Sequence, residues 1–398
     1  MTGDPKRDDP FASPARHAKA TKHDSRRSNL RTTLELVSHR GSTSRAEISR
    51  ETGLTRAAVS SLVGELMETG LLREIGRGSS AGGKPPTLLA LNERGRDIVA
   101  LDLGHRPFRA ALVDLSGRIH ERIDAGTIAD NPVGEAANQV AIELIARLIA
   151  RATAPVLGIG VGTPGVVDND GRVLEAANLD WHGVDLASEL RARFDIPVSI
   201  ANDAQVAALA EFRRHPADRR NLLLVKLGTG VGAGVVLNGS LYKGEHSAAG
   251  EIGHVRAVDD GDVCRCGNHG CLETVASVPA ILRRLGADPQ HHPWDALALA
   301  GLVGEEPVRR VLSEVGRNLG SVLANVVAML DVGHLVLAPE LLNAGDVLVT
   351  EIRKELGSRI LPATADLIKI EVTQLGGDLV LAGAASAVLA DRLGVVLR

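Results

Sequence analysis

The sequence predicts a mixed α/β protein in which a small N-terminal helix-turn-helix domain precedes a larger body of two α/β lobes. Three observations indicate this. Three short helical patterns are followed by a hairpin, an alternation of strands and helices starts near residue 97, and glycine-rich turns occur in both halves of that alternation. We therefore predict a disordered arm over 1–27, a winged helix-turn-helix over 28–93, and the two-lobed body over 97–398.

The composition is that of an ordinary globular protein. Of the 398 residues, 44% are hydrophobic and 24% are charged, and no apolar run reaches the ~18 residues that a membrane span needs. The N-terminus is polar, without the apolar stretch of a secretory signal, so we expect no membrane partner. The 3 cysteines lie close together, which argues against a disulfide framework and favours the cytoplasm.

Charge is distributed unevenly along the chain. Residues 1–96 contain 17 Lys and Arg against 11 Asp and Glu, whereas the remaining residues contain 28 against 38. A basic N-terminal region on an acidic body suggests a polyanionic partner at that end, although a solvated basic face would give the same count. Within the arm, Lys19, Lys22, Arg26 and Arg27 are either phosphate contacts or part of a solvated tail.

The helical patterns near the N-terminus have the order of a helix-turn-helix. Leu30, Leu34 and Val37 recur at helical spacing in the first segment. A capping box at 44–47 opens the second helix, and Thr55 caps the third. Two helices separated by a tight turn and preceded by another helix are typical of a helix-turn-helix.

Two strand patterns, over 71–76 and 87–91, predict a hairpin with a long basic tip, which is the wing of a winged helix. In such modules the third helix lies in the major groove, and its first residues reach base edges and phosphates. The predicted DNA contacts are Thr55, Arg56, Ala57, Ser60 and Ser61 on the helix and Arg77 and Lys84 on the wing. A winged helix that makes only protein contacts is the alternative.

The body begins with a strand–turn–strand pattern over 98–115. An amphipathic helix over 136–152 and buried strands follow, then a second hairpin over 221–244, a long helix near 307–330 and a last helix near 379–393. Glycine-rich hairpin turns expose backbone N–H groups that bind anions. Two such turns with a carboxylate nearby are typical of an actin-like phosphotransferase.

One short stretch, 250–273, contains a predicted metal site. His254 and all three cysteines, Cys264, Cys266 and Cys271, fall inside it. Three thiols and an imidazole complete a closed tetrahedral set for a structural Zn²⁺. Three unrelated buried cysteines are the alternative. Glu251 and Glu273 lie among these ligands without being needed by the metal, which suggests that the metal holds polar side chains for another purpose.

Several motifs together resemble the ROK family (repressor, open reading frame, kinase). They are GVGTPGVVD, ANDAQVAALAE, LGTGVGAGVV, GEIGH and CRCGNHGCLE, and the resemblance extends from residue 29 through the chain. It implies an actin-like (ribonuclease H-like) ATPase or sugar-kinase fold behind the winged helix. It also implies a sugar pocket made of Gly165, Asn178, Asn202, Asp203, Glu251, His254 and Glu273, in which Asp203 matches the catalytic base of the family's kinases.

The nucleotide motifs depart from the kinase pattern of that family. The first turn keeps Asp102 and Gly104, but the next three residues are His105, Arg106 and Pro107 instead of Gly-Thr-Lys. The late strand continues into 338–340, Ala-Pro-Glu, where the kinases have a glycine-rich adenosine loop. The second turn is intact at Gly228, Thr229, Gly230 and Gly232. We therefore expect these phosphate-binding residues to be vestigial, and we expect neither ATP nor Mg²⁺ as a cofactor.

The leading functional hypothesis is a sugar-responsive, DNA-binding regulator of carbohydrate genes, with repression as the favoured mode. It would bind operator DNA as a homodimer or homotetramer, because an isolated winged helix reads few base pairs. The helix near 307–330 is a candidate interface or a core helix. The competing hypothesis is an active, glucokinase-like, ATP-dependent hexose kinase with a DNA-binding appendage. A regulator that responds to a protein partner is a third possibility.

Overall fold

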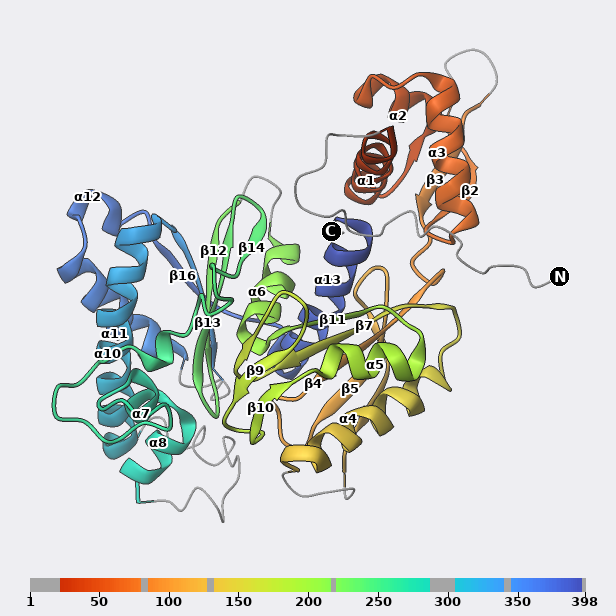
Figure 1. Cartoon of the computed structure of the whole chain (residues 1–398). Helices are drawn as coiled ribbons and strands as arrows, with labels where there is room; N and C mark the ends of the chain where they lie inside the picture. Colours follow the sequence, from red (N-terminus) through yellow and green to blue (C-terminus); the bar gives the residue numbers. More distant parts are fainter. Residues whose placement is uncertain are drawn as a thin grey trace.

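The computed structural model describes residues 22–79, 85–126, 132–215, 220–286, 305–339 and 345–395 (Figure 1). The helix-turn-helix module lies at one end of a body whose two lobes are each built on a five-stranded sheet. The predicted fold class, a winged helix-turn-helix followed by a two-lobed α/β body, is confirmed.

The N-terminal module contains three helices and a three-stranded sheet. Its elements are α1 (Lys22–Arg40), β1 (Thr43–Ser44), α2 (Arg45–Thr52), α3 (Arg56–Glu68), β2 (Leu72–Arg77) and β3 (Thr87–Leu91), with the strand order β1-β3-β2. Ser44 caps α2 through the predicted capping box, in which the Ser44 and Glu47 side chains each accept from the other residue's backbone N–H. The tip of the wing, 80–84, lies outside the described residues and includes Lys84.

The first helix is longer than the sequence predicted. It begins at Lys22, so the prediction of a disordered arm that reaches residue 27 is wrong for residues 22–27, and residues 1–21 lie outside the described part. Arg26, in the added turn, forms an ion pair with Glu65 of α3. This polar contact extends the helix beyond the hydrophobic pattern that starts at Leu30, which is why hydrophobic periodicity did not reveal it.

The first lobe is built on a mixed sheet with the strand order β11-β7-β4-β5-β6. Its elements are β4 (Asp97–Asp102), β5 (Arg109–Asp114), β6 (Ile119–Asp124), α4 (Gly134–Ile149), β7 (Val156–Thr163), α5 (Leu186–Phe194) and β11 (Val198–Asn202). The sequence did not predict β6, because this edge strand, IHERID, is mostly polar. It also missed a small separate sheet made of β8 (Val166–Val167), β9 (Val173–Ala176) and β10 (Trp181–Val184).

The second lobe is built on a sheet with the strand order β14-β13-β12-β15-β16. Its strands are β12 (Leu222–Leu227), β13 (Val231–Leu237), β14 (Ser240–Tyr242), β15 (His334–Pro339) and β16 (Lys369–Val372). Its helices are η1 (Ile252–His254), α7 (Leu272–Ala276), α8 (Val278–Arg284), α10 (Glu306–Leu330), α11 (Gly345–Arg359) and α12 (Pro362–Ala365). One face of α10, including Val315 and Leu319, is buried in the core of this lobe, so that face is core rather than free surface.

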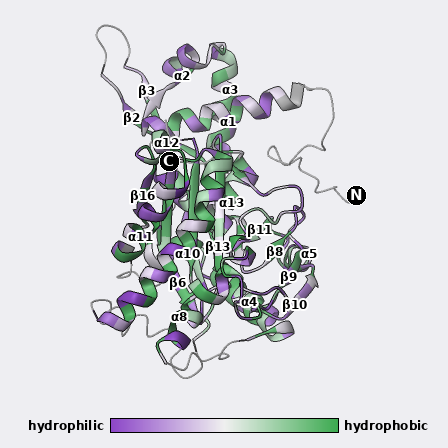
Figure 2. Cartoon of the chain, turned by 90° about the vertical axis from the view of Figure 1, so that its left-hand side faces the viewer, coloured by the Kyte–Doolittle hydropathy of each residue, from purple (hydrophilic) through white to green (hydrophobic). Residues whose placement is uncertain are grey.

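Two helices lie between the lobes, α6 (Asp203–Arg214) and α13 (Leu379–Leu393), the latter preceded by η3 (Gly376–Asp378). They pack backbone against backbone, because a Cβ added to Gly383 of α13 would lie 2.0 Å from the carbonyl oxygen of Val206 of α6. Figure 2 shows hydrophobic residues concentrated in α13 and the central strands, with hydrophilic ones on outer helices.

The winged helix shares a hydrophobic cluster with α13 and β4. Leu30 of α1 and Leu66 of α3 belong to the same buried cluster as Leu389 and Leu393 of α13 and Ile98 of β4. The winged-helix module and the body therefore share a buried hydrophobic core.

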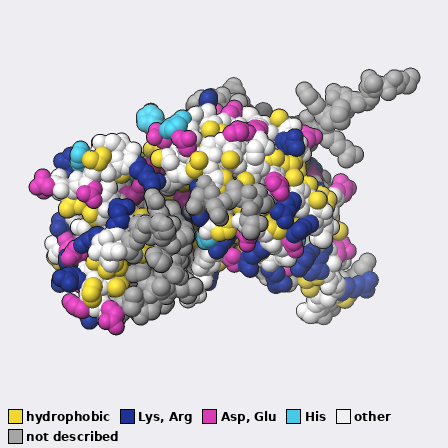
Figure 3. All heavy atoms as spheres, turned by 90° about the horizontal axis from the view of Figure 1, so that it is seen from below, with side chains coloured by type: hydrophobic (Ala, Val, Ile, Leu, Met, Phe, Trp, Pro, Cys, Tyr) yellow, Lys and Arg dark blue, Asp and Glu magenta, His cyan; other side chains and the backbone are white. Residues whose placement is uncertain are grey.

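Side chains of both charge signs lie on the surface of the described residues. On the face shown in Figure 3, Lys and Arg side chains are interspersed with Asp and Glu. Within the described residues, no helix is both long and apolar enough to cross a membrane.

Candidate ligand pocket and metal cluster

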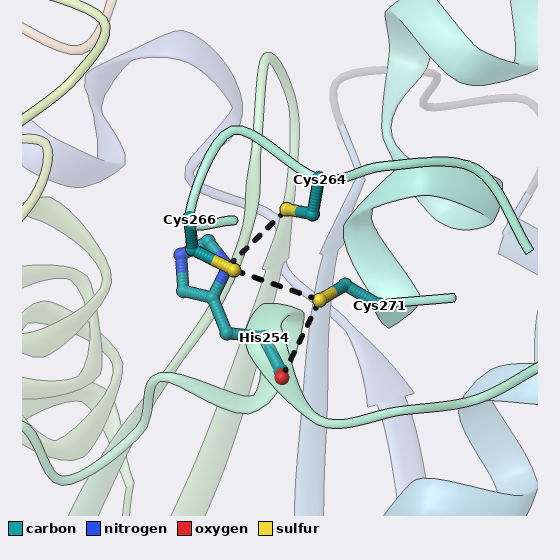
Figure 4. Close-up of side chains that lie close together, drawn as sticks. All are labelled: His254, Cys264, Cys266 and Cys271. Carbon is teal, nitrogen blue, oxygen red and sulfur yellow. Dashed lines mark hydrogen bonds between the residues drawn. The ribbon is translucent and has the colours of Figure 1, made fainter. Parts of the chain in front are cut away.

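The four predicted metal ligands converge, although they come from separate segments. His254 ends the short helix η1, Cys264 and Cys266 lie in the following loop, and Cys271 immediately precedes α7. Their side chains point toward one another (Figure 4), and their ligand atoms all lie within 4.8 Å of one another. The Sγ atoms of Cys266 and Cys271 are 3.7 Å apart, and Cys264 Sγ is 3.6 Å from His254 Nδ1.

This geometry fits a structural zinc ion. Tetrahedral Zn²⁺, with bonds of about 2.3 Å to sulfur and 2.0 Å to nitrogen, places its ligand atoms about 3.5–3.8 Å apart. The Cys264–His254 and Cys266–Cys271 separations, 3.6 and 3.7 Å, agree with this spacing. Burial raises the pKa of the Cys264 thiol, and it raises that of Cys271 to about 12. A bound cation would favour the thiolate forms over the protonated ones. The three cysteines and His254 therefore form a cluster consistent with the predicted zinc site.

A cavity of about 290 Å³ lies beside this cluster, between the lobes. It is close to the lower end of the ~300–1,000 Å³ typical of small-molecule sites. Every residue predicted to contact sugar lines it: Gly165, Asn178, Asn202, Asp203, Glu251, His254 and Glu273. The structure thus brings together the set that the sequence motifs had selected.

The wall from the first lobe is set by the junction of β11 and α6. Asn202 caps α6 by accepting hydrogen bonds from Ala204 N and Gln205 N, and its Nδ2 donates to Gly165 O at 2.9 Å. Gly165 has a φ of +87° and approaches the Glu175 carbonyl oxygen so closely that an added Cβ would lie 1.9 Å from it. Glycine is therefore required at 165, and the Asn202 amide is already partly engaged in structure.

Lys226 is the main pocket residue that sequence reasoning missed. Its Nζ lies 3.1 Å from Asp203 Oδ2, and both side chains are only 13% exposed. The available signal was a lysine inside β12, an otherwise apolar strand, LLLVKL, because a charge in such a strand needs a partner. In this structure the carboxylate that matches the kinase base is therefore ion-paired.

On the wall from the second lobe, His254 lies between the metal cluster and the cavity. Its Nδ1 faces Cys264, and its Nε2 lies 3.8 Å from Glu251 Oε2. Burial raises the pKa of Glu251; His254 opposes this shift, while Asp203 and Glu273 add to it. Glu273 Oε2 accepts a hydrogen bond from Val231 N at 3.1 Å.

The sequence did not predict that two arginines contact Asn178. Arg265 lines the cavity and donates to Asn178 Oδ1, whereas Arg106 donates to the Asn178 backbone oxygen at 3.1 Å. The guanidinium of Arg106 also lies 4.5 Å from the centre of the Phe108 ring. Nothing in the local sequence pattern pairs these residues, since 106, 178 and 265 lie far apart along the chain.

Residues of the first hairpin turn, between β4 and β5, form hydrogen bonds with one another. Asp102 Oδ1 accepts from both Gly104 N, at 2.9 Å, and His105 N, at 3.2 Å. Burial lowers the pKa of His105, which favours the neutral imidazole. A Cβ added to Gly104 would lie 2.4 Å from Asp203 Oδ2, so the turn and that carboxylate are in close contact.

The second turn remains beside the cavity. Thr229, Gly230 and Gly232 line it, and Gly228 N donates within the turn to Gly230 O at 2.9 Å. The sequence predicted that 338–340 replace the adenosine loop of the kinases. Of these three residues, Glu340 lies outside the described part of the chain.

The predicted DNA-contacting residues on α3 are exposed. Thr55 caps the helix by accepting from Ala58 N at 3.2 Å, and Arg56, Ala57, Ser60 and Ser61 are all exposed. Ser61 also accepts a hydrogen bond from Arg26 of α1 at 3.3 Å. Arg77 lies exposed at the end of β2.

Comparisons with known proteins agree with this two-part architecture. The ROK family model matches residues 98–391, and the IclR helix-turn-helix domain model matches residues 33–76. The xylose repressor of Bacillus spizizenii is 28% identical over 376 residues, covering 92% of this chain and 96% of the relative.

Two solved structures share the fold. A ROK family transcriptional regulator, described as a homolog of the E. coli MLC protein, superposes with a TM-score of 0.79 at 26% identity, covering 94% of this chain and 98% of that one. A ROK family glucokinase from Streptomyces griseus, in complex with glucose and AMPPNP, has a TM-score of 0.60 at 27% identity and covers 73% of this chain and 98% of its own. The chain belongs to the ROK family, and its helix-turn-helix domain places it with the transcriptional regulators of that family.

Proposed function

We propose that this protein binds a sugar in the cleft between its lobes and DNA through its winged helix, and that sugar binding changes its affinity for operator DNA. One chain of contacts carries the proposal. Asp203 lines the cavity and is the first residue of α6; α6 packs on α13, and α13 shares a buried core with the winged helix. A change at the cavity therefore has a route through neighbouring elements to the DNA-binding module.

The coupling needs different sugar affinities in the DNA-competent and DNA-incompetent states. The cavity supports this because its walls come from both lobes. Gly165 and Asn178 belong to the first lobe, whereas Glu251 and Glu273 belong to the second. A sugar bonded to both walls would favour a closed arrangement of the lobes, and the α6–α13 contact would pass that change to the winged helix.

The chemistry of the lining suits a monosaccharide. Carboxylates and amides that face one small cavity match hydroxyl groups, each of which donates and accepts. The relatives are described as a xylose repressor and as a glucokinase with bound glucose, so pentoses and hexoses are the first candidates. Zinc held by His254, Cys264, Cys266 and Cys271 would fix the second wall and orient the His254 ring toward the sugar.

Regulation is favoured over phosphoryl transfer because the groups that a kinase would use, the base and the phosphate-binding N–H groups, already have partners within the protein. Lys226 pairs with Asp203, and Asp102 occupies the N–H groups of Gly104 and His105 that would cradle phosphate. A coupled ATPase assay with pentoses, hexoses and amino sugars tests the competing kinase function. Sugar-dependent turnover that Asp203→Asn eliminates would contradict a purely regulatory role.

The remaining parts of the proposal concern assembly and mode of action. We infer a cytoplasmic homodimer or homotetramer that represses carbohydrate genes, since paired winged helices are needed to read a palindromic operator. The test is a thermal-shift screen of sugars and sugar phosphates on the full-length protein, followed by DNA binding to the promoter region of its own gene with each ligand that raises Tm. Failure of every sugar to raise Tm would favour a regulator that responds to a protein partner.

The DNA-binding face is tested separately from the pocket. Arg56→Ala should weaken operator binding by about 1–3 kcal/mol and relax the preference at one base pair. Arg353→Ala, an exposed arginine on α11, is the matched control and should leave DNA binding unchanged. Equal loss in both variants would show only a non-specific charge effect and would contradict base recognition by α3.

A further inference from the structure

A second group of metal-ligand side chains lies at the end of α6 remote from the ligand cavity. His215 follows the last residue of α6, His334 begins β15, and Glu371 lies on β16. One ligand atom from each of the three lies within 4.8 Å of the other two. These residues are distinct from the Cys/His cluster and do not line the cavity beside it.

Their geometry is compact and largely enclosed. His334 Nε2 lies 3.0 Å from Glu371 Oε2, and His334 is only 6% exposed. The rings of His215 and His334 have centroids 4.3 Å apart and are nearly perpendicular, at 85°. Two imidazoles and a carboxylate from three separate segments thus meet at one point.

A fourth group of suitable chemistry comes from α6 itself. Glu211 is one helical turn before His215, and its Oε2 lies 3.7 Å from His215 Nε2. The hydroxyl of Thr373 donates to the other oxygen, Oε1, of this buried carboxylate. Carboxylates beside metal ligands are commonly oriented by such a hydrogen bond.

We propose that His215, His334 and Glu371 form a second metal site, for a divalent transition ion of the zinc type, with the Glu211 carboxylate beside it. Bonds of about 2.0–2.1 Å in a four-coordinate site place ligand atoms about 3.3 Å apart. The nitrogen–oxygen separation between His334 and Glu371, 3.0 Å, is close to that value. Two imidazoles with a carboxylate suit Zn²⁺, Ni²⁺ or Co²⁺ rather than Mg²⁺ or Ca²⁺, which prefer all-oxygen ligands.

The proposed site lies where α6 meets the sheet of the second lobe. It ties the C-terminal end of α6 to the first residue of β15 and to the edge strand β16 of the second lobe. The N-terminal end of the same helix carries Asn202 and Asp203 of the ligand cavity. A metal bound at 215 and 334 would hold α6 against the second-lobe sheet.

Metal content of the full-length protein tests the proposal. After removal of loose metal, wild type should hold one more equivalent of zinc than His215→Gln or Glu371→Gln. Glu371 is half-exposed, so its near-isosteric substitution should leave the fold intact, which circular dichroism checks. The matched control is His120→Gln, which removes a partly buried His–Asp pair that has no second histidine, and it should keep the wild-type metal content.

Cobalt substitution distinguishes the two sites. Cobalt bound by cysteines gives intense sulfur-to-metal charge-transfer bands, whereas a site of nitrogen and oxygen ligands gives only weak d–d bands. Cys266→Ser should remove the charge-transfer bands and leave the weak bands, and Glu371→Gln should do the reverse. If Cys266→Ser removes all bound metal, or if His215→Gln and Glu371→Gln retain the wild-type content, the second site does not exist.

Discussion

The two sides of the cleft differ in how their polar groups are used. On the sugar side, carboxylates and an imidazole from both lobes face a cavity, and the Cys/His cluster supports one wall. On the nucleotide side, Asp102 occupies the N–H groups of the first turn, and that turn lies against Asp203. The same two-lobed scaffold therefore directs several polar side chains into one cavity, whereas the first turn on the other side uses its N–H groups for its own hydrogen bonds.

This difference shows that recognition and turnover depend on separate parts of the fold. Sugar recognition needs groups that converge and remain available, whereas phosphoryl transfer also needs a positioned nucleotide and an available base. Lys226, paired with Asp203, lies at the boundary of the two sides. The predictions below test each side and this boundary.

The largest expected effect comes from removing a metal ligand. Cys266→Ser should release zinc, and because a structural zinc contributes on the order of 10 kcal/mol to its site, the sugar-side wall should lose its order. Sugar response should be abolished while the winged helix stays folded. Metal analysis with DNA binding in the presence of sugar measures both effects, and an intact sugar response without zinc would refute the support role.

The second prediction concerns the ion pair at the boundary. Lys226→Met leaves the Asp203 carboxylate without its counter-charge, which costs about 3–5 kcal/mol for a fully buried pair and somewhat less here, because both side chains are 13% exposed. Urea unfolding should show this loss, and Asp203→Asn in the same chain should recover most of it. Additive destabilisation in the double variant would mean that the two residues do not interact.

A matched pair of substitutions compares the two sides directly. Glu273→Gln on the sugar side should abolish or strongly weaken the thermal shift with sugar. Asp102→Asn on the nucleotide side should cost about 1 kcal/mol of stability through its turn hydrogen bonds but leave the sugar shift unchanged. A sugar-dependent Tm shift that survives Glu273→Gln but is lost in Asp102→Asn would contradict the assignment of sugar binding to the Glu273 side.

The smallest expected effect is the absence of a nucleotide response. ATP or a non-hydrolysable analogue with Mg²⁺ should not raise Tm, because the first turn satisfies its own N–H groups and neutral His105 crowds it. The positive control is the sugar that raises Tm most. A nucleotide-dependent Tm shift as large as that with sugar would support the competing kinase function.

Much of the architecture was predictable because local patterns agree with the tertiary structure. The capping box at Ser44, the apolar face of α3 and the limits of α13 follow from spacing and caps alone. The edge strand β6 and the first turn of α1 were missed, because polar contacts rather than hydrophobic periodicity define them.

Only the cavity residues that lie inside recognisable sequence motifs could be predicted. The motifs selected seven of the residues that line the cavity, since each of the seven lies in a short conspicuous segment. Lys226 and Arg265 act through partners distant in sequence, and no spacing rule connects them to Asp203 or Asn178. The His215–His334–Glu371 group was missed for the same reason, because three elements of the fold bring it together.

One titration tests the central claim most directly: the affinity of the full-length protein for its promoter DNA, measured by fluorescence anisotropy with and without the sugar that raises Tm. The proposal predicts that saturating sugar changes the apparent Kd for DNA by about 5–150-fold, the range of a coupling free energy of 1–3 kcal/mol. Glu273→Gln should bind DNA with the same affinity whether or not sugar is present. A sugar that binds wild type tightly yet leaves its Kd for DNA unchanged would contradict the proposal.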